Sequence, residues 1–331
     1  MAADADQGLI PGGLSALADE LRTHSALLAK AEIGLVSEVL GQDSWLHGPG
    51  DDGAVIAMPS SPMPAAGHVI ACGEALLPAF VAADPYGAGF AAVLANVNDL
   101  AAMGAIPRGI VDTIVGNVEL AREALRGMRD ASRLYDVPLV GGHLSIHDGA
   151  PALSAFGVGH ADAVLSSTHV AAGQSLILAC CTQGTMRADF PFFRSFDGRG
   201  TEMAGDVRVL AAIATAGSCV AAKDVSMAGL VGSLAMLLEF SGCGVSLDLD
   251  ALPRPTEVPM ATWLTCFPAY SFLLCSPPGR EDECLQPFLD RGLEAAVVGT
   301  IDDSGLLVLA AGNERATVLD LAITPITGLA R

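Results

Sequence analysis

The spacing of apolar residues in the first half of the chain switches between helix and strand periods. Leucines at positions 14, 17, 21, 27, 28 and 35 follow a helical spacing, so one or two amphipathic helices are expected within residues 14–40. Further on, short apolar runs predict strands and longer periodic runs predict helices. The strands are expected at Ala54–Met58, His68–Cys72, Ile110–Val115, Val137–Val140 and Ala152–Val158, with a proline-rich turn at Pro59–Pro64 and helices at Gly87–Met103 and Leu120–Tyr135. This alternation predicts an α+β domain that ends near residue 165.

The second half repeats the mixture of short apolar runs and helical spacing. Strands are expected at Ser175–Cys180, Val245–Leu249, Phe272–Leu274, Ala295–Gly299 and Leu306–Leu309, helices at 206–216 and 227–241, and a long polar loop at Gln183–Gly205. The chain of 331 residues is long enough for two domains. We therefore expect one domain over residues 1–165 and a second over residues 166–331.

Composition and charge exclude several classes of function. Seventeen Lys and Arg stand against 37 Asp and Glu, and a net charge of −20 disfavours binding to nucleic acid or to an anionic membrane. No run of about 20 apolar residues predicts a membrane span. The eight cysteines form no Cys-x-x-Cys pair, and the start of the chain lacks a basic region, so a cytoplasmic protein with free thiols is expected. An apolar content of 51% favours a large buried interface, as in an obligate oligomer.

Two acidic, glycine-containing segments carry the candidate chemistry. Residues 48–53 read Gly-Pro-Gly-Asp-Asp-Gly, and residues 96–107 read Asn-Val-Asn-Asp-Leu-Ala-Ala-Met-Gly-Ala-Ile-Pro. The adjacent carboxylates of Asp51 and Asp52 repel each other, and a hard cation between them relieves that repulsion. Mg²⁺ accepts carboxylate oxygens while it bridges substrate phosphates. The alternative is a solvated acidic turn after Pro-Gly.

Together with further motifs in the same order, these segments resemble the PurM-like superfamily. That superfamily includes aminoimidazole ribonucleotide synthetase, thiamine-monophosphate kinase, selenophosphate synthetase and the hydrogenase-maturation carbamoyl dehydratase. The further motifs are Val140–His143, Asp224–Leu230 and Gly242–Val245, the last leading into Leu247–Asp250. The resemblance implies an α+β two-domain fold, with a β-barrel shared by the N-terminal domains of a homodimer and an α/β C-terminal domain. It also implies binding of ATP and Mg²⁺ in a cleft near the dimer interface.

The resemblance assigns roles to the residues of the two acidic segments. Asp51 and Asp52 match the metal-binding pair, and Gly53 lies beside them at the nucleotide. Asp99 matches an acidic residue that reaches metal and phosphate. Burying a lone Asp in the apolar run that follows it is costly without a partner, which also favours a functional role. The neighbouring Asn96 and Asn98 are expected to contact the cofactor, although Asn96 could equally pack at an interface.

Three further positions complete the implied site. Glu74 stands where relatives carry a metal-binding Asp, and its alternative role is a charge on an edge strand. His143 follows Gly141 and Gly142 at a strand end; it can donate a hydrogen bond to phosphate, or it can be a structural histidine. Asp224 matches an acidic residue at the second domain's side of the nucleotide. Asp99, Asp224 and His143 are the candidate catalytic residues.

Other positions bear on the acceptor. Met227 replaces a second Asp found in thiamine-monophosphate kinases, which counts against that activity because Met is no ligand for Mg²⁺. The loop at 183–205 holds Arg187, Arg194 and Arg199 among four phenylalanines. Arginine pairs with phosphate or carboxylate through two parallel hydrogen bonds, so these residues are candidate substrate ligands. The alternative is a packed loop with solvated arginines.

We therefore expect an ATP- and Mg²⁺-dependent phosphotransfer or synthetase-type enzyme that activates a small acceptor at a cleft between domains. Two alternatives stay open. One is a catalytically degenerate nucleotide-binding or assembly protein, which Met227 and Glu74 favour. The other is a thiamine-monophosphate kinase.

Overall fold

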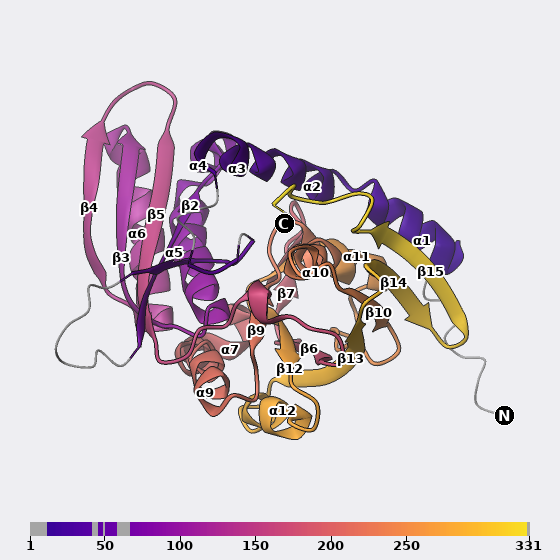
Figure 1. Ribbon diagram of the computed structural model, residues 1–331. Helices are drawn as coiled ribbons and strands as arrows, with labels where there is room; N and C mark the ends of the chain where they lie inside the picture. Colours follow the sequence, from indigo (N-terminus) through magenta and orange to yellow (C-terminus); the bar gives the residue numbers. More distant parts are fainter. Residues whose placement is uncertain (1–11, 42–45, 49, 58–66, 330–331) are drawn as a thin grey trace. The chain divides into compact units, whose positions relative to one another are not determined.

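The computed structural model describes residues 12–41, 46–48, 50–57 and 67–329 (Figure 1). The chain forms two compact units that are each built from separate segments. The small unit contains residues 52–164 and 199–215, and the large unit contains the described parts of 1–51, 165–198 and 216–331. The expected turn at Pro59–Pro64 and the end of the first expected strand, Met58, lie outside the described residues.

The small unit is a five-stranded sheet with its helices packed on one face (Figure 1). Its strands, in spatial order, are β1 (Ala54–Ile56), β2 (His68–Ala75), β5 (Ala152–Ala161), β3 (Ile106–Gly116) and β4 (Leu139–Ile146). All neighbours are antiparallel except β3 and β4. The helices are α4 (Pro78–Ala83), α5 (Pro85–Ala102), α6 (Val118–Tyr135), α8 (Met203–Asp206) and α9 (Val209–Ala216), with a 3₁₀ turn at Gly200–Glu202.

Local signals explain where the two long helices of the small unit begin. The Asp84 side chain accepts a hydrogen bond from Gly87 N at 2.8 Å, and Pro85 occupies the first turn of α5. Asn117 caps α6 in the same way through Leu120 N at 2.9 Å. The two helices approach closely because Gly89 faces the backbone of Ala124, leaving no room for a Cβ atom.

The segment at 199–215 joins the small unit through polar contacts with the end of α6. The Arg208 guanidinium donates to the carbonyl oxygens of Tyr135 at 3.2 Å and Asp136 at 3.0 Å. Arg199 forms an ion pair with the fully buried Asp206. The Arg208 contacts explain why a segment that lies late in the sequence packs against α6 of the small unit.

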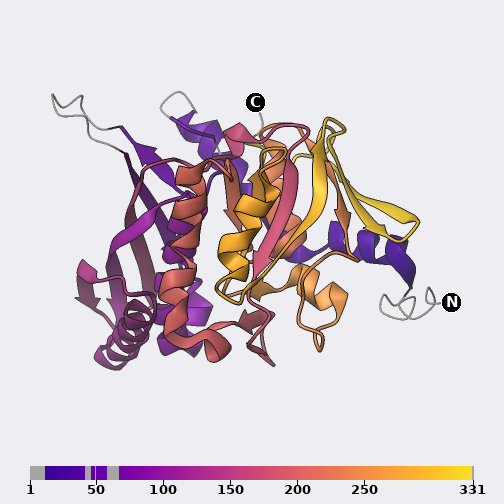
Figure 2. The same cartoon turned by 90° about the horizontal axis from the view of Figure 1, so that it is seen from below.

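The large unit is built on a seven-stranded sheet that mixes early and late parts of the chain. Its order is β15 (Glu314–Asp320), β14 (Leu306–Ala311), β10 (Gly244–Asp248), β13 (Glu294–Asp302), β6 (Ser175–Cys180), β12 (Ser271–Ser276) and β9 (Ala221–Asp224). Figure 2 shows this sheet from below; in it β6 lies between β13 and β12, which both come from the last part of the chain. Buried side chains such as Leu178, Leu234, Leu273 and Trp263 form the core of this unit.

The remaining elements of the large unit flank this sheet. The α-helices are α1 (Gly13–Arg22), α2 (Ser25–Leu28), α3 (Gly34–Leu40), α7 (Phe196–Arg199), α10 (Gly229–Glu239), α11 (Met260–Thr265) and α12 (Glu281–Leu289), with 3₁₀ turns at Ala29–Ile33 and Ser167–His169. Arg199, the last residue of α7, already belongs to the small unit. A small sheet joins β7 (Thr185–Met186), β8 (Phe192–Arg194) and β11 (Phe267–Pro268). Within the described ranges, no helix has the length and apolar character needed to cross a lipid bilayer.

The expected mixture of helices and sheets in two units is confirmed. Strand β4 was expected at Val137–Val140 and instead covers Leu139–Ile146, which includes Gly141 and Gly142. The expected loop at 183–205 contains the short strands β7 and β8 and three helical turns. Helices α4, α11 and α12 and strands β9, β11 and β15 were not predicted from the sequence.

Candidate functional site

Asp51 is held by a pair of serines from a distant part of the chain. Its carboxylate accepts hydrogen bonds from Ser166 Oγ at 2.6 Å and from Ser167 N and Ser167 Oγ, both at 2.7 Å. Gly48 allows this approach, since a Cβ atom there would lie 2.7 Å from Ser167 Oγ. A carboxylate has about four lone-pair sites, so three of them are used in fixing this loop. The two serines were not anticipated from the sequence.

A buried lysine holds the same loop from another strand. Lys223, on β9, is only 3% exposed, and its Nζ lies 3.5 Å from the carbonyl oxygen of Gly50. Asp224 follows it at the end of β9 and is also 3% exposed. A lysine is rarely buried without partners, and here one partner is the backbone of the acidic loop. Sequence reasoning singled out Asp224 but missed Lys223.

Asp52 and Asp99 meet in the small unit. One carboxylate oxygen of each lies within 4.8 Å of the other, and both side chains are half-buried. Asp52 precedes β1, and Asp99 lies in the last turn of α5. Gly53 lets the backbone after Asp52 pack closely on the small unit's core, because a Cβ atom there would lie 3.0 Å from Ile70 and 3.2 Å from Met103. Two carboxylates at this separation suit a hard divalent cation with oxygen ligands.

The two asparagines beside Asp99 are buried, at 0% and 1% exposure for Asn96 and Asn98. The Asn96 amide donates to Ala92 O at 2.8 Å and to Ala155 O at 3.2 Å, and Cys72 Sγ lies 3.2 Å from its Oδ1. Asn96 therefore joins α5 to two strands of the sheet. Its amide is engaged inside the small unit, which differs from the packing at an interface that the sequence left open.

Two acidic side chains, Glu74 and Asp112, lie on the helix-covered face of the small sheet. In the strand register, Glu74 on β2 and Asp112 on β3 both lie opposite Ala155, and Asp112 also lies opposite Gly142. Burial raises the pKa of the Asp112 carboxyl group above its usual value. Sequence reasoning missed Asp112, since a single Asp in an apolar strand has no local signature.

His143 lies on the other face of this sheet. It is opposite Thr113 in the register, one residue beyond the Gly142–Asp112 pair, and successive residues of a strand point to opposite faces. Its Nε2 lies 3.3 Å from Ser145 Oγ; His143 is exposed and Ser145 is half-buried. The structure therefore does not bring His143 to the face that carries Glu74. Gly141 and Gly142 precede it within β4.

The three loop arginines lie in different surroundings. Arg187 pairs with Asp189 at 2.6 Å, and Arg194 pairs with Asp197 at 2.7 Å; all four side chains are partly exposed. Arg199 instead contacts both carboxylate oxygens of the buried Asp206, at 2.9 and 2.8 Å. Arg187 and Arg194 remain accessible to a ligand, whereas Arg199 is engaged inside the small unit. Met227 is 43% exposed just before α10.

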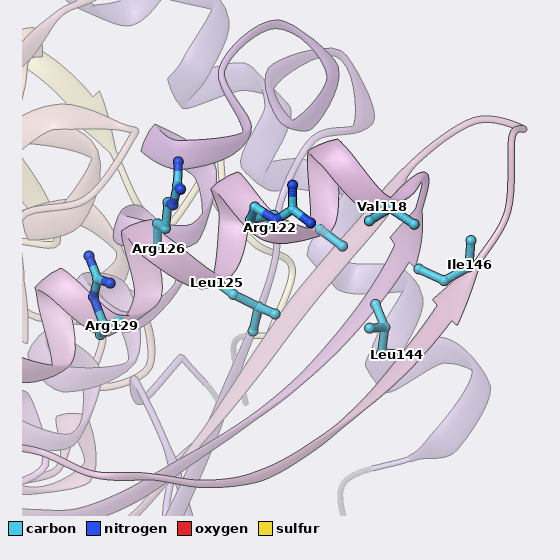
Figure 3. Close-up of a pocket in the computed structure, with 8 residues that line it drawn as sticks. Val118, Arg122, Leu125, Arg126, Arg129, Leu144 and Ile146 are labelled. Atoms are coloured by element: carbon cyan, nitrogen blue, oxygen red, sulfur yellow. The ribbon is translucent and has the colours of Figure 1, made fainter.

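A shallow cavity of about 410 Å³ lies between α6 and the edge strand β4 (Figure 3). Its apolar side chains are Val118, Ala121, Leu125, Leu144 and Ile146, and Arg122, Arg126 and Arg129 line it as well. Figure 3 shows the three arginines following one side of α6, while Leu125 points toward the strand side. The cavity contains none of the residues that the sequence singled out.

Comparison with known proteins gives the family. The model of "AIR synthase related protein, N-terminal domain" matches residues 50–161, and that of the corresponding C-terminal domain matches residues 200–312. The chain is 33% identical over 325 residues to the Synechocystis protein sll0787, covering 95% of this chain and 98% of that one. It is 29% identical over 245 residues to the Methanocaldococcus jannaschii protein MJ0640, covering 70% and 74%.

More distant similarities include proteins with stated activities. A phosphoribosylformylglycinamidine synthase subunit PurL from Bradyrhizobium is 28% identical over 297 residues, and the chain spans only 39% of its length. Among solved structures, T. maritima PurL complexed with ADP has a TM-score of 0.76 at 16% identity, covering 93% of this chain and 51% of that one. AaThiL complexed with AMPPCP and TMP has a TM-score of 0.63 at 17% identity, covering 87% and 96%. The two family models and the similarity to sll0787 together show that this chain belongs to the AIR synthase-related family of the PurM-like superfamily.

Proposed function

We propose that the protein binds ATP with Mg²⁺ and transfers a phosphoryl group to a small acceptor. The observation that carries the proposal is the approach of the Asp52 and Asp99 carboxylate oxygens to within 4.8 Å of each other. Nucleotides in the solved structures of similar proteins, ADP in T. maritima PurL and AMPPCP in AaThiL, support the choice of ligand.

In this proposal the two aspartates hold the cation, which would neutralise charge on the phosphates. Asp51 keeps the loop in place through Ser166 and Ser167, and it is proposed as a further metal ligand. Lys223 supports the loop through Gly50. Glu74 remains a proposed further metal ligand.

The remaining candidates have proposed roles at the nucleotide and the acceptor. Asp224, Gly53, Asn98, Gly141 and Gly142 are proposed to contact the nucleotide. His143 is proposed to donate a hydrogen bond to phosphate, a role that requires the phosphate to reach the sheet face opposite Glu74. Arg187 and Arg194 are proposed to bind the acceptor. For Arg199 that role requires release from Asp206, which makes it the weakest of the three.

The direct test is calorimetric titration of the whole protein with ATP in excess Mg²⁺ and again with EDTA. We expect binding that depends on the metal, because two carboxylates repel a triphosphate unless a cation lies between them. Phosphorus NMR then monitors the γ-phosphate in the presence of a panel of metabolites. Loss of that phosphate would identify the protein as an enzyme. Equal affinity in both buffers, or no binding in either, would overturn the metal site.

A second candidate is a nucleotide-binding protein without turnover. Met227 and Glu74 favour it, because each departs from the carboxylate pattern of the kinases that the chain resembles. Metal-dependent binding without loss of the γ-phosphate in any metabolite mixture would favour this candidate. Thiamine-monophosphate kinase activity is the third candidate, and one assay with that substrate tests it.

We also propose a cytoplasmic homodimer. All eight cysteines are free thiols, which supports a reducing compartment. The face of the small sheet opposite its helices exposes Ile56, Phe156 and Val158, each between 42% and 45% exposed. A second copy of the chain would remove these side chains from water.

A further inference from the structure

A second, larger cavity lies wholly within the large unit. Its volume is about 880 Å³, within the range of about 300–1,000 Å³ that small-molecule sites span. Two segments form most of its wall, residues 182–186 after β6 and residues 253–258 after β10, together with Phe193 and Glu294. The cavity contains none of the aspartates of the candidate metal site.

The wall of this cavity is held in place by contacts that need no ligand. The Pro253 carbonyl accepts a hydrogen bond from Trp263 Nε1 at 3.0 Å, and Arg254 Nη1 donates to Val258 O at 2.9 Å. Phe193 packs edge-on against Trp263 with ring centroids 5.5 Å apart. A cavity with fixed walls binds a small molecule without first ordering a loop.

Three charged side chains line the cavity: Arg254, Glu257 and Glu294. They make few hydrogen bonds to the residues that the structure describes. Arg254 donates through Nη1 only, so its Nε and Nη2 make no hydrogen bond to a described residue. The carboxylates of Glu257 and Glu294 likewise have neither a hydrogen bond nor an ion pair within the part of the chain that the structure describes. One cation and two anions around a cavity suit a ligand that has an anionic group and a protonated amine. Two carboxylates would repel the polyphosphate of a second nucleotide.

The strand register places this cavity on the same end of the sheet as Asp224. Glu294 on β13 lies opposite Cys180 on β6, which lies opposite Ser271 on β12, and Val225 after β9 donates to Ser271 O at 2.9 Å. Three strand spacings, about 14 Å, separate the cavity rim at Glu294 from the end of β9. The cavity and Asp224 therefore lie along the same end of one sheet.

We propose that this cavity binds a small zwitterion that carries a protonated amine and a carboxylate or phosphate group. Arg254 binds the anionic group, and Glu257 and Glu294 bind the amine.

The binding claim is tested without nucleotide and with EDTA present, so that the metal site plays no part. The probe is O-phosphoethanolamine, compared with its single-charge halves, ethanolamine and methyl phosphate, by saturation-transfer NMR. We expect the zwitterion to bind about tenfold more tightly than either half. Glu294→Gln and Arg254→Gln should each weaken its binding by about tenfold, because each removes a charge-assisted contact. Glu314→Gln, an exposed site on β15 of the same unit, is the matched control and should bind as the unmodified protein does.

The proposal is overturned if O-phosphoethanolamine fails to bind at millimolar concentration, or if the Arg254 and Glu294 variants bind it as well as the control. Melting curves exclude unfolding as the cause of any loss. Failure here with intact Mg-ATP binding would remove the cavity assignment alone. Loss of Mg-ATP binding with the zwitterion still bound would remove the proposed function and leave this site.

Discussion

Two neighbouring carboxylates, Asp51 and Asp52, are in different surroundings. Asp51 accepts three hydrogen bonds from Ser166 and Ser167 in the large unit, while Asp52 lies beside Asp99 in the small unit. The sequence predicted a shared role for both, because adjacent residues of one type look alike in a motif. The serines lie 115 and 116 residues away, and no local pattern predicts a contact at that separation.

This difference predicts that Asp→Asn substitutions at the two positions affect different properties. Asp52→Asn and Asp99→Asn should each lower Mg-ATP affinity by about ten- to a hundredfold, since losing one charge-assisted ligand costs about 1.5–3 kcal/mol. Calorimetry measures the affinity, and Asp303→Asn, an exposed site in the large unit, is the control. Unchanged affinity in both variants would remove these residues from the metal site.

Asp51→Asn should instead act mainly on stability. The amide cannot accept both of the Ser167 hydrogen bonds and the Ser166 hydrogen bond equally well, because only one of its two head atoms is an acceptor. We expect the free energy of unfolding, measured by urea titration, to fall by about 1–3 kcal/mol. Unchanged stability together with a loss of metal-dependent affinity would show that Asp51 acts mainly as a metal ligand.

Asp112 predicts a dependence of stability on pH. Burial raises the pKa of its carboxyl group in the folded protein, so the folded state binds a proton more tightly than the unfolded state. Its contribution to stability is therefore fully present below the unfolded pKa and is lost as the pH rises through the folded pKa. Asp112→Asn should raise the melting temperature at neutral pH, and the gain should disappear in acid. An equal shift at both pH values would indicate a packing effect unrelated to ionisation.

At the scale of elements, the helices that position Asp99 were predictable and several strands were not. Helix α5 begins at Asp84-Pro85 and is followed by Gly104, which has a φ of +73°, so both ends have chemical signals in the sequence. Strand β9 contains only four residues and includes Lys223, and among the described strands it pairs with β12 at the edge of the sheet. Helix α12 contains Pro287. Strand β9 forms because it pairs with a strand that is distant in the sequence, and α12 forms because it packs against a core built by distant segments.

The N-terminal cap of α5 can be tested apart from the site at its other end. Asp84→Ala removes the acceptor for Gly87 N and should destabilise the protein by about 1 kcal/mol. Asp99 lies 15 residues further on, about 22 Å along the helix, so Mg-ATP affinity of the folded variant should not change. Urea titration and calorimetry check the two expectations. A large loss of affinity would show that the start of α5 controls the position of Asp99.

At the scale of the whole molecule, the small sheet presents an apolar face that its own helices leave open. Phe156 and Val158 on β5 and Ile56 on β1 are exposed by 45%, 42% and 44%. Alternation along β5 places the two β5 side chains on the face opposite α5 and α6. The apolar composition predicted an interface of this kind, but only the strand register shows which side chains form it.

We expect the protein to sediment at micromolar concentration with about twice the mass of the 33.6 kDa chain. Phe156→Glu should shift it toward the monomer, because a carboxylate placed in an apolar interface loses its hydration without gaining a partner. Phe190→Glu, at a side chain that is 40% exposed in the large unit, should leave the mass unchanged. Circular dichroism confirms that both variants fold, since each position is exposed within one chain. A monomeric unmodified protein, or a Phe156→Glu variant that keeps the dimer mass, would show that this face is not the interface.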